Sequence, residues 1–277
     1  MRSAIVAVAL ASALSAAAEQ AWAAPEVVTI HNGEFTLHAT LFKPDGQGPF
    51  PTVVGLHSCE SLNNATGGLA AHYRDWGERL NKAGFVLLLP DSYGSRSVGP
   101  QCRTSRTTVR TDRERVEDAQ AARAWLQNQS YVKPDHISLI GWSDGGISVL
   151  WTVRPRARIK DNKPDFRSAI ALYPGCRRLD TAAWAARIPT LILSGGADDV
   201  VSYHACEQMV AGARGRSARV QMIVYPGAYH DFDRPNRTVQ QRTGYAFSTD
   251  GSGKIHTGTN PAARADVVRR VPQWLAR

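Results

Sequence analysis

After its first segment the sequence has no long apolar run, no dense basic tract, no low-complexity linker and no internal repeat. The one early apolar run, residues 5–18, is shorter than the ~20 residues that cross a bilayer, so we do not expect a membrane protein. Lys and Arg are scattered without interleaved aromatics, which argues against a nucleic-acid partner. With 43% hydrophobic residues, the composition excludes global disorder and favours one domain over residues 24–277.

Residues 1–23 are typical of a secretory signal peptide. Arg2 gives a short positive start, the apolar run follows, and residues 21–23 (AWA) offer a small-residue cleavage site. Cleavage would remove one charge of each sign, so the mature chain keeps the net charge of +9. We therefore expect a basic secreted protein without membrane contact after cleavage. The short, alanine-rich form of the signal favours a bacterial periplasm, and the oligomeric state is open.

Only four cysteines are present, and all of them follow the signal segment. An even number of cysteines in an exported chain predicts two disulfides, with three possible pairings. No cysteine spacing resembles a zinc site, so no metal is expected. The predicted strands place two pairs in loops at the same sheet edge, which favours Cys59 with Cys102 and Cys176 with Cys206.

Strand and helix patterns alternate along most of the chain. An alternating segment around Asn32–Gly33 predicts an antiparallel hairpin over residues 26–43. The repeated alternation that follows predicts an α/β fold with a mostly parallel sheet and helices on both faces. Further strands are predicted at 51–57, 85–90, 136–142, 167–173, 190–194 and 219–225, and helices at 68–83, 112–129, 144–153, 202–213 and 262–276. Two irregular stretches, 92–111 and 231–260, follow strand ends, where ligands bind in such sheets.

The segment from Gly141 to Gly145 (GWSDG) fits the pattern GxSxG. A predicted strand leads into it and a predicted helix leads out, which is the setting of a nucleophile elbow. Glycines on both sides of Ser143 would let the chain make the sharp turn that exposes a nucleophilic hydroxyl. The alternative is an ordinary Gly-Ser turn at the start of a helix.

A nucleophilic serine needs a base, and the base needs a carboxylate that orients it. In folds with this elbow the order along the chain is serine, acid, histidine. Asp198 and Asp199 follow one predicted strand, and His230 follows the next directly. We prefer Asp198 over Asp199 and His230 over His256, which lies in polar loop sequence. The alternatives are helix capping for the aspartates and a structural role for the histidine.

Two backbone amides are candidates for the oxyanion hole that acyl transfer requires. One is the amide of Asp144, which follows the nucleophile. The other belongs to the loop after strand 51–57, where we assign Cys59. The expected bridge to Cys102 would then hold this loop in place.

Seven stretches together resemble the dienelactone hydrolase family, in a secreted branch, along nearly the whole mature chain: TVVGLHSC, LLLPDSYGSR, DAQAARAWL, LIGWSDGG, ALYPGC, LSGGADDVVSYHAC and YPGAYHDFDR. This resemblance implies a single-domain α/β-hydrolase that needs no cofactor and acts on lactones or small esters. It also implies Ser143, Asp198 and His230 as the catalytic residues.

The chain differs from the namesake enzymes of that family at the nucleophile. They use a cysteine where this chain has Ser143, and they mostly carry an apolar residue where it has Asp144, whose charge would repel anionic substrates. Arg96 and Arg234 occupy positions similar to arginines that hold the substrate carboxylate in those enzymes. Arginine suits that task through its planar fork. The alternative is that both are solvent-exposed loop residues.

The sequence therefore predicts a serine hydrolase of esters or lactones whose substrate is a small molecule. Two other functions remain open. One is a peptidase or acylaminoacyl hydrolase with the same triad, and the other is a non-catalytic exported binding protein, because a fold does not dictate a function.

Overall fold

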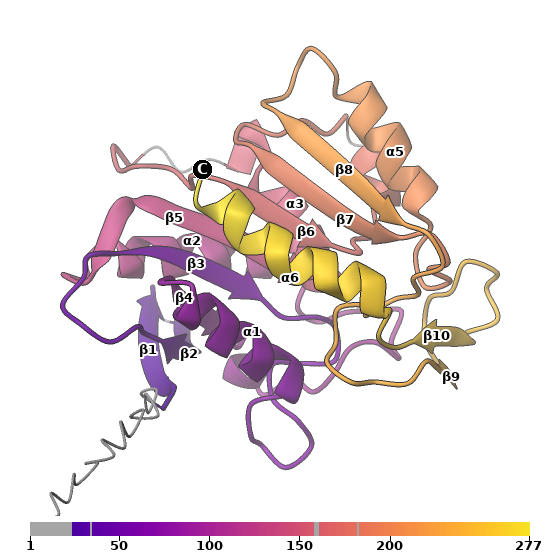
Figure 1. Cartoon of the computed structure of the whole chain (residues 1–277), viewed down its shortest axis with the longest axis horizontal. Helices are drawn as coiled ribbons and strands as arrows, with labels where there is room; N and C mark the ends of the chain where they lie inside the picture. The colour runs from indigo at the N-terminus through magenta and orange to yellow at the C-terminus, as the bar shows by residue number, and fades with distance from the viewer. Residues whose placement is uncertain (1–23, 34, 158–160, 182) are drawn as a thin grey trace, which may run out of the picture.

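The computed structural model describes residues 24–33, 35–157, 161–181 and 183–277 (Figure 1). The predicted signal peptide, residues 1–23, lies outside the described residues. Within the described part of the chain, none of the helices combines the length and apolar character needed to cross a bilayer.

The N-terminal segment forms the predicted hairpin. Strands β1 (Glu26–Asn32) and β2 (Phe35–Phe42) pair antiparallel along the whole length of β1, and Gly33 adopts a positive φ of 63° in the turn. Strand β2 also pairs antiparallel with β4 (Val86–Pro90), so it joins the hairpin to the main sheet.

The main sheet has eight strands in the order β1-β2-β4-β3-β5-β6-β7-β8, and the pairs from β4 to β8 are parallel. Strands such as β4 and β7 are buried along their whole length, which explains their continuous apolar sequences. The remaining strands are β3 (Phe50–Leu56), β5 (Val132–Trp142), β6 (Ala169–Leu172), β7 (Thr190–Gly195) and β8 (Val220–Tyr225). The predicted mostly parallel α/β architecture is confirmed.

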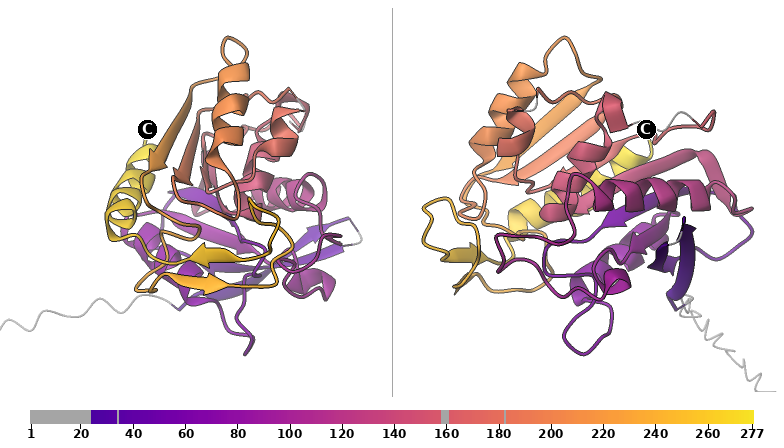
Figure 2. Two further views of the ribbon diagram at one scale, coloured as in Figure 1. Left: turned by 90° about the vertical axis from the view of Figure 1, so that its right-hand side faces the viewer. Right: turned by 180° about the vertical axis from the view of Figure 1, so that it is seen from behind.

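Helices cover both faces of this sheet (Figure 2). One core layer includes Trp76 and Trp274, and the opposite layer includes Ala119, Val149 and Met209. Helices α1 (Ala71–Lys82) and α6 (Pro261–Leu275) supply the first layer, and α2 (Glu114–Leu126), α3 (Asp144–Thr152) and α5 (Tyr203–Gly212) supply the second. The short helical turns are η1 (Gly94–Arg96), η2 (Pro155–Ala157) and α4 (Arg177–Asp180).

The chain leaves β3 toward β4 on one side, and β5 lies on the other side. In open α/β sheets, ligands bind at the carboxyl ends of the strands on either side of such a change of direction, which here are the ends of β3 and β5. The stretch 231–260, which the sequence analysis describes as irregular, also contains a small antiparallel sheet of β9 (Gln240–Arg242) and β10 (Ile255–Thr257). Strands of three residues are too short to show periodicity in the sequence.

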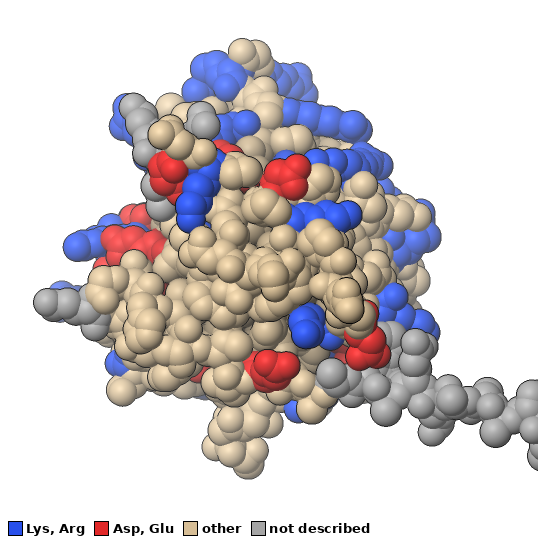
Figure 3. All heavy atoms as spheres, turned by 90° about the vertical axis from the view of Figure 1, so that its left-hand side faces the viewer, with Lys and Arg blue, Asp and Glu red and all other residues tan. Residues whose placement is uncertain are grey.

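Lys and Arg side chains lie scattered over the side of the molecule shown in Figure 3, with Asp and Glu among them. The absence of a nucleic-acid partner stays a prediction.

Candidate active site

Ser143 lies at the sharp turn between β5 and α3. Its φ is 53°, a left-handed value that non-glycine residues rarely adopt, and its amide donates to the Leu172 carbonyl on β6 over 3.0 Å. A Cβ atom at Gly141 would overlap the Gly145 carbonyl, and one at Gly145 would overlap the Leu56 carbonyl. Glycine is therefore required at both positions, because the backbone segments approach each other closely there. The positive φ of Ser143 is a local strain of the kind found at functional sites.

The structure brings together the three side chains that the sequence analysis selects as a triad. His230 Nε2 lies 2.9 Å from Ser143 Oγ, and His230 Nδ1 lies 2.7 Å from Asp198 Oδ2. The other Asp198 oxygen accepts the amides of Val200 and Val201 over 2.9 and 3.0 Å. Because β5, β7 and β8 end at the same edge of a parallel sheet, residues far apart in sequence meet there.

The electrostatics favour a proton on His230. Burial alone would lower the pKa of this imidazole, but the neighbouring Asp198 carboxylate outweighs burial and raises the pKa to about 9. An imidazolium that forms when Ser143 loses its proton would be stabilised in the same way.

The two candidate oxyanion amides lie beside the elbow. Among the described residues, no acceptor is bound to the backbone N–H of Cys59 or of Asp144. Because Gly145 has no side chain, the start of α3 packs directly against the Leu56 carbonyl. The loop after β3 therefore lies next to the nucleophile turn. The Cys59 carbonyl accepts the amide of Gln101 over 2.8 Å. This leaves the N–H groups of two adjoining turns available to a ligand.

Both expected disulfides are present. Cys59 is bonded to Cys102, and Cys176 is bonded to Cys206. The first bridge ties the candidate oxyanion loop to the loop after β4. The second ties the end of β6 to α5, which begins just after Asp198.

The two arginines expected near a substrate carboxylate are held by protein carboxylates. Arg96 forms two hydrogen bonds of 2.8 Å with Asp118, and its guanidinium lies 4.1 Å from the centre of the Phe35 ring. Arg234 forms ion pairs with Glu60 and with Asp231, the latter over 3.0 Å. These contacts do not support a role in substrate binding for Arg96, and for both residues that role stays a prediction.

Asp144 lies beside an unusual buried cation. Burial raises the pKa of the Asp144 carboxyl, while the positive charge of Arg115 acts in the opposite direction. Arg115 is fully buried, donates to the His57 carbonyl and lies 5.3 Å from the centre of the Tyr93 ring. The positive charge of Arg115 therefore offsets part of the repulsion of anions expected from Asp144.

A buried carboxylate that the sequence analysis misses lies underneath the site. Asp233 accepts hydrogen bonds from His72 Nε2 at 2.9 Å, Trp76 Nε1 at 2.7 Å, Trp142 Nε1 at 3.1 Å and the Tyr173 hydroxyl at 2.8 Å. Burial would raise the pKa of this carboxyl, but the charge of His72 and these donors hold the pKa well below its usual range. No local pattern marks this residue, because its partners lie on α1, on β5 and directly after β6.

Asp233 also links the nucleophile strand to the histidine loop. Trp142 immediately precedes Ser143, and the Tyr173 ring packs against the His230 imidazole with 4.6 Å between ring centres. The Asp233 carboxylate therefore fixes both sides of the Ser143–His230 contact.

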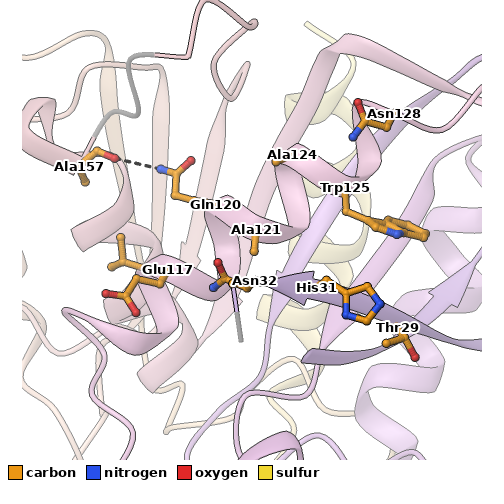
Figure 4. A pocket seen from close by; sticks show the side chains of 12 residues that line it. Thr29, His31, Asn32, Glu117, Gln120, Ala121, Ala124, Trp125, Asn128 and Ala157 are labelled. Carbon is orange, nitrogen blue, oxygen red and sulfur yellow. Dashed lines mark hydrogen bonds between the residues drawn. The ribbon is translucent and has the colours of Figure 1, made fainter. Parts of the chain in front are cut away.

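A pocket of about 580 Å³ between β1 and α2 lies away from these residues (Figure 4). It is lined by Thr29, His31 and Trp125 among others, and Gln120 donates to the Ala157 carbonyl at its rim over 3.0 Å. None of the triad side chains lines it.

Comparison with known proteins identifies the family of this chain. Residues 37–277 match the model of the dienelactone hydrolase family. A Synechocystis protein described as a carboxymethylenebutenolidase is 27% identical over 129 residues, which is 43% of this chain and 50% of that relative, so the match spans about half of the relative's length.

Two solved structures illustrate the shared fold. A dienelactone hydrolase-like promiscuous phosphotriesterase from metagenomic libraries has a TM-score of 0.70 and 20% identity, with 91% of this chain and 97% of that chain covered. Esterase 2 of Thermogutta terrifontis, in its tabun-treated form, has a TM-score of 0.64 and 17% identity, with 91% and 94% covered. The family match extends over most of the chain, and the chain therefore belongs to the dienelactone hydrolase family of α/β-hydrolases.

Proposed function

We propose that this protein is a serine hydrolase that cleaves carboxylic ester or lactone bonds through an acyl-enzyme intermediate. The observation that carries the proposal is the His230 imidazole, which contacts the Ser143 hydroxyl on one side and the Asp198 carboxylate on the other. Membership of the dienelactone hydrolase family and the fold shared with esterases support a hydrolase.

In the acylation step, Ser143 Oγ attacks the substrate carbonyl carbon while its proton passes to His230 Nε2. Asp198 holds the Nδ1–H and stabilises the imidazolium. His230 then returns the proton to the leaving alkoxide as the carbonyl–oxygen bond breaks. Water repeats these steps on the acyl-enzyme, which releases the acid and restores the serine.

The developing oxyanion requires donors aimed at its position. We assign this role to the amides of Cys59 and Asp144, whose N–H groups are not bonded within the described residues. Loss of one such donor typically reduces kcat by about 10²- to 10³-fold. The bridge from Cys59 to Cys102 would keep the first donor in place.

The proposal is tested by hydrolysis of p-nitrophenyl esters across acyl lengths, with a lactone in parallel, by the purified mature protein and its Ser143→Ala variant. We expect activity in the first and background rates in the second, and the chain-length profile would measure the acyl pocket. Equal activity in both folded proteins would contradict the proposed nucleophile.

Two measurements separate this function from its alternatives. A peptidase would turn over an amide as well as the matching ester, whereas an esterase would not. A binding protein without catalysis would not react with a fluorophosphonate probe, which we expect to label Ser143.

We further propose that the protein is exported, with the bacterial periplasm as its destination. The two disulfides support an oxidising compartment. Fractionation of cells that express the full chain, with detection of the mature N-terminus by mass spectrometry, tests this location.

A further inference from the structure

The loop after β3 carries Cys59, whose amide is the first of the two proposed oxyanion donors. Each carbonyl of residues 57–59 accepts a hydrogen bond. In chain order the donors are the Arg115 guanidinium, His57 Nδ1 over 2.7 Å and the Gln101 amide over 2.8 Å. The carbonyls of this loop are therefore all held by the protein.

The amides on either side of Cys59 are held as well. The Ser58 amide donates to the Tyr73 hydroxyl over 2.8 Å, and the Glu60 amide donates to Ser58 Oγ over 3.2 Å. Between them, the Cys59 N–H has no acceptor among the described residues. The loop thus has an ordered backbone with one amide left for a ligand.

The direction of that amide is set by the peptide unit that joins Ser58 to Cys59. In a planar trans peptide the C=O and the N–H point in opposite directions. Because His57 Nδ1 lies 2.7 Å from the Ser58 carbonyl oxygen, the Cys59 N–H points away from the imidazole. The Ser61 amide contacts the same oxygen only over 3.4 Å, so the imidazole makes the shorter contact.

The His57 imidazole contacts this carbonyl as a neutral donor. A carbonyl oxygen accepts but cannot donate, so the ring proton lies on Nδ1. The side chain is fully buried, and its Nε2 has no hydrogen-bond partner among the described residues. Burial and the charge of Arg115 lower the pKa of this imidazole well below its usual value, so the ring stays neutral at neutral pH.

His57 is itself held rigidly. Its ring packs edge-on against Tyr93, with 4.6 Å between the ring centres. Its carbonyl accepts the Arg115 guanidinium, which lies 5.3 Å from the centre of the same Tyr93 ring. A Cβ atom at Gly145 would lie only 2.7 Å from the His57 carbonyl oxygen, so this backbone also packs against the nucleophile elbow. The imidazole is therefore a fixed support between the elbow and the oxyanion loop.

We infer that His57 is a positioning residue for the hydrolysis, and that its Nδ1–H holds the Ser58–Cys59 peptide so that the Cys59 N–H faces the oxyanion. The inference rests on the proposed function and gives a role to a buried histidine outside the triad. His57 acts through the Cys59 amide and does not touch the substrate. Because the oxyanion develops only toward the transition state, its effect falls on kcat and not on KM.

Three substitutions at this position test the inference. His57→Asn keeps an N–H donor in place of Nδ1, since both nitrogens are bonded to Cγ. His57→Leu has nearly the same shape as asparagine but no donor, and His57→Gln carries its donor one bond further from the backbone. All three lose the imidazole ring and its packing against Tyr93, so a difference among them reports the position of the donor.

We expect kcat for ester hydrolysis to fall about 10- to 10²-fold in His57→Leu and His57→Gln but to stay within about threefold of the wild type in His57→Asn. KM should stay within about threefold in all of them. An alkyl trifluoromethyl ketone gives a second readout, because its adduct with Ser143 places an oxyanion in the same hole. Its inhibition constant should rise in parallel with the loss of kcat, as for a transition-state analogue.

Equal kcat in His57→Asn and His57→Leu, whether retained or lost, would overturn the inference, as would a loss confined to KM. Urea denaturation identifies the variants that fold. If His57→Leu does not fold, the comparison of His57→Asn with His57→Gln still decides, because both carry the same amide group. Failure of the proposed function is distinct, since it would appear as ester hydrolysis that survives Ser143→Ala.

Discussion

Two neighbouring aspartates in this protein each bind a histidine, and the two pairs differ in their surroundings. Asp198 holds His230 Nδ1 and Asp199 holds His256 Nδ1, both over 2.7 Å. The His230 side chain is 6% exposed and that of His256 is 34% exposed. His230 contacts the Ser143 hydroxyl, whereas the His256 ring packs near Tyr229, with 5.0 Å between the ring centres.

The comparison shows that a short aspartate–histidine contact does not by itself make a catalytic pair. The first pair is buried, so its charges interact through a low dielectric. It also has a nucleophile at the free ring nitrogen. The second pair connects β10 to the loop after β7, because the His256 amide also donates to Asp199 over 2.8 Å. We interpret it as a structural contact that fixes the loop 231–260 against the site.

The largest effect on kcat is expected from a carboxylate-to-amide substitution at Asp198, with the same substitution at Asp199 as the comparison. Asp198→Asn should lower kcat by about 10⁴-fold, because the histidine loses the partner that sets its tautomer and stabilises its charged form. Asp199→Asn should stay within about threefold, since the substitution leaves the catalytic contacts intact. Ester hydrolysis by both folded variants measures the effect, and equal losses would erase the distinction between the pairs.

The pH profile of the wild type is the next test. Only neutral His230 can accept the serine proton, and its pKa is raised to about 9, so kcat/KM should fall about tenfold per unit below that pH. In Asp198→Asn the midpoint should move to lower pH. A wild-type profile that is flat from pH 7 to 10 would contradict the raised pKa.

The stability of the folded protein should decrease as pH rises, whereas the activity should increase. Because the pKa of His230 in the folded state exceeds the unfolded value of 6.5, its stabilising contribution is complete below about pH 6.5 and is lost as pH rises through 9. Denaturation midpoints of the wild type and His230→Gln should therefore converge between pH 6.5 and 10.

A smaller effect is expected from the two disulfides. Replacing Cys59 and Cys102 by serine should lower kcat about tenfold through a less ordered oxyanion loop. Replacing Cys176 and Cys206 should mainly reduce stability, by about 2 to 4 kcal/mol. Comparison of kcat with the unfolding free energy in both double variants separates the effects, and equal kcat values would show that the first bridge has no positioning role.

The smallest change is expected from His256→Gln. The glutamine would lose one partly exposed contact, so the unfolding free energy should fall by about 1 kcal/mol, and ester kcat should stay within about twofold. Urea denaturation and initial rates measure the two quantities. A loss of kcat comparable to that of Asp198→Asn would mean that the second pair takes part in the reaction.

Much of the fold could be predicted from local patterns. The continuous apolar sequence of β4 and the alternation in β1 and β2 identify strands directly, since side-chain spacing depends only on neighbouring residues. The three-residue strands β9 and β10 were not predicted, because they form only through their pairing with each other. Local patterns identify an element whose own residues determine its structure. They do not identify an element that forms only by pairing with another segment.

The sequence by itself determined the position of the elbow at Ser143 and the order of the candidate acid and base, because a GxSxG turn between strand and helix is local. The sequence favoured Asp198 and His230, but only the tertiary structure shows that Asp198 meets His230 while Asp199 meets His256. It also decided that Asp233 collects four donors from distant elements. These contacts depend on how strands and helices pack, and no short segment of the chain contains that information.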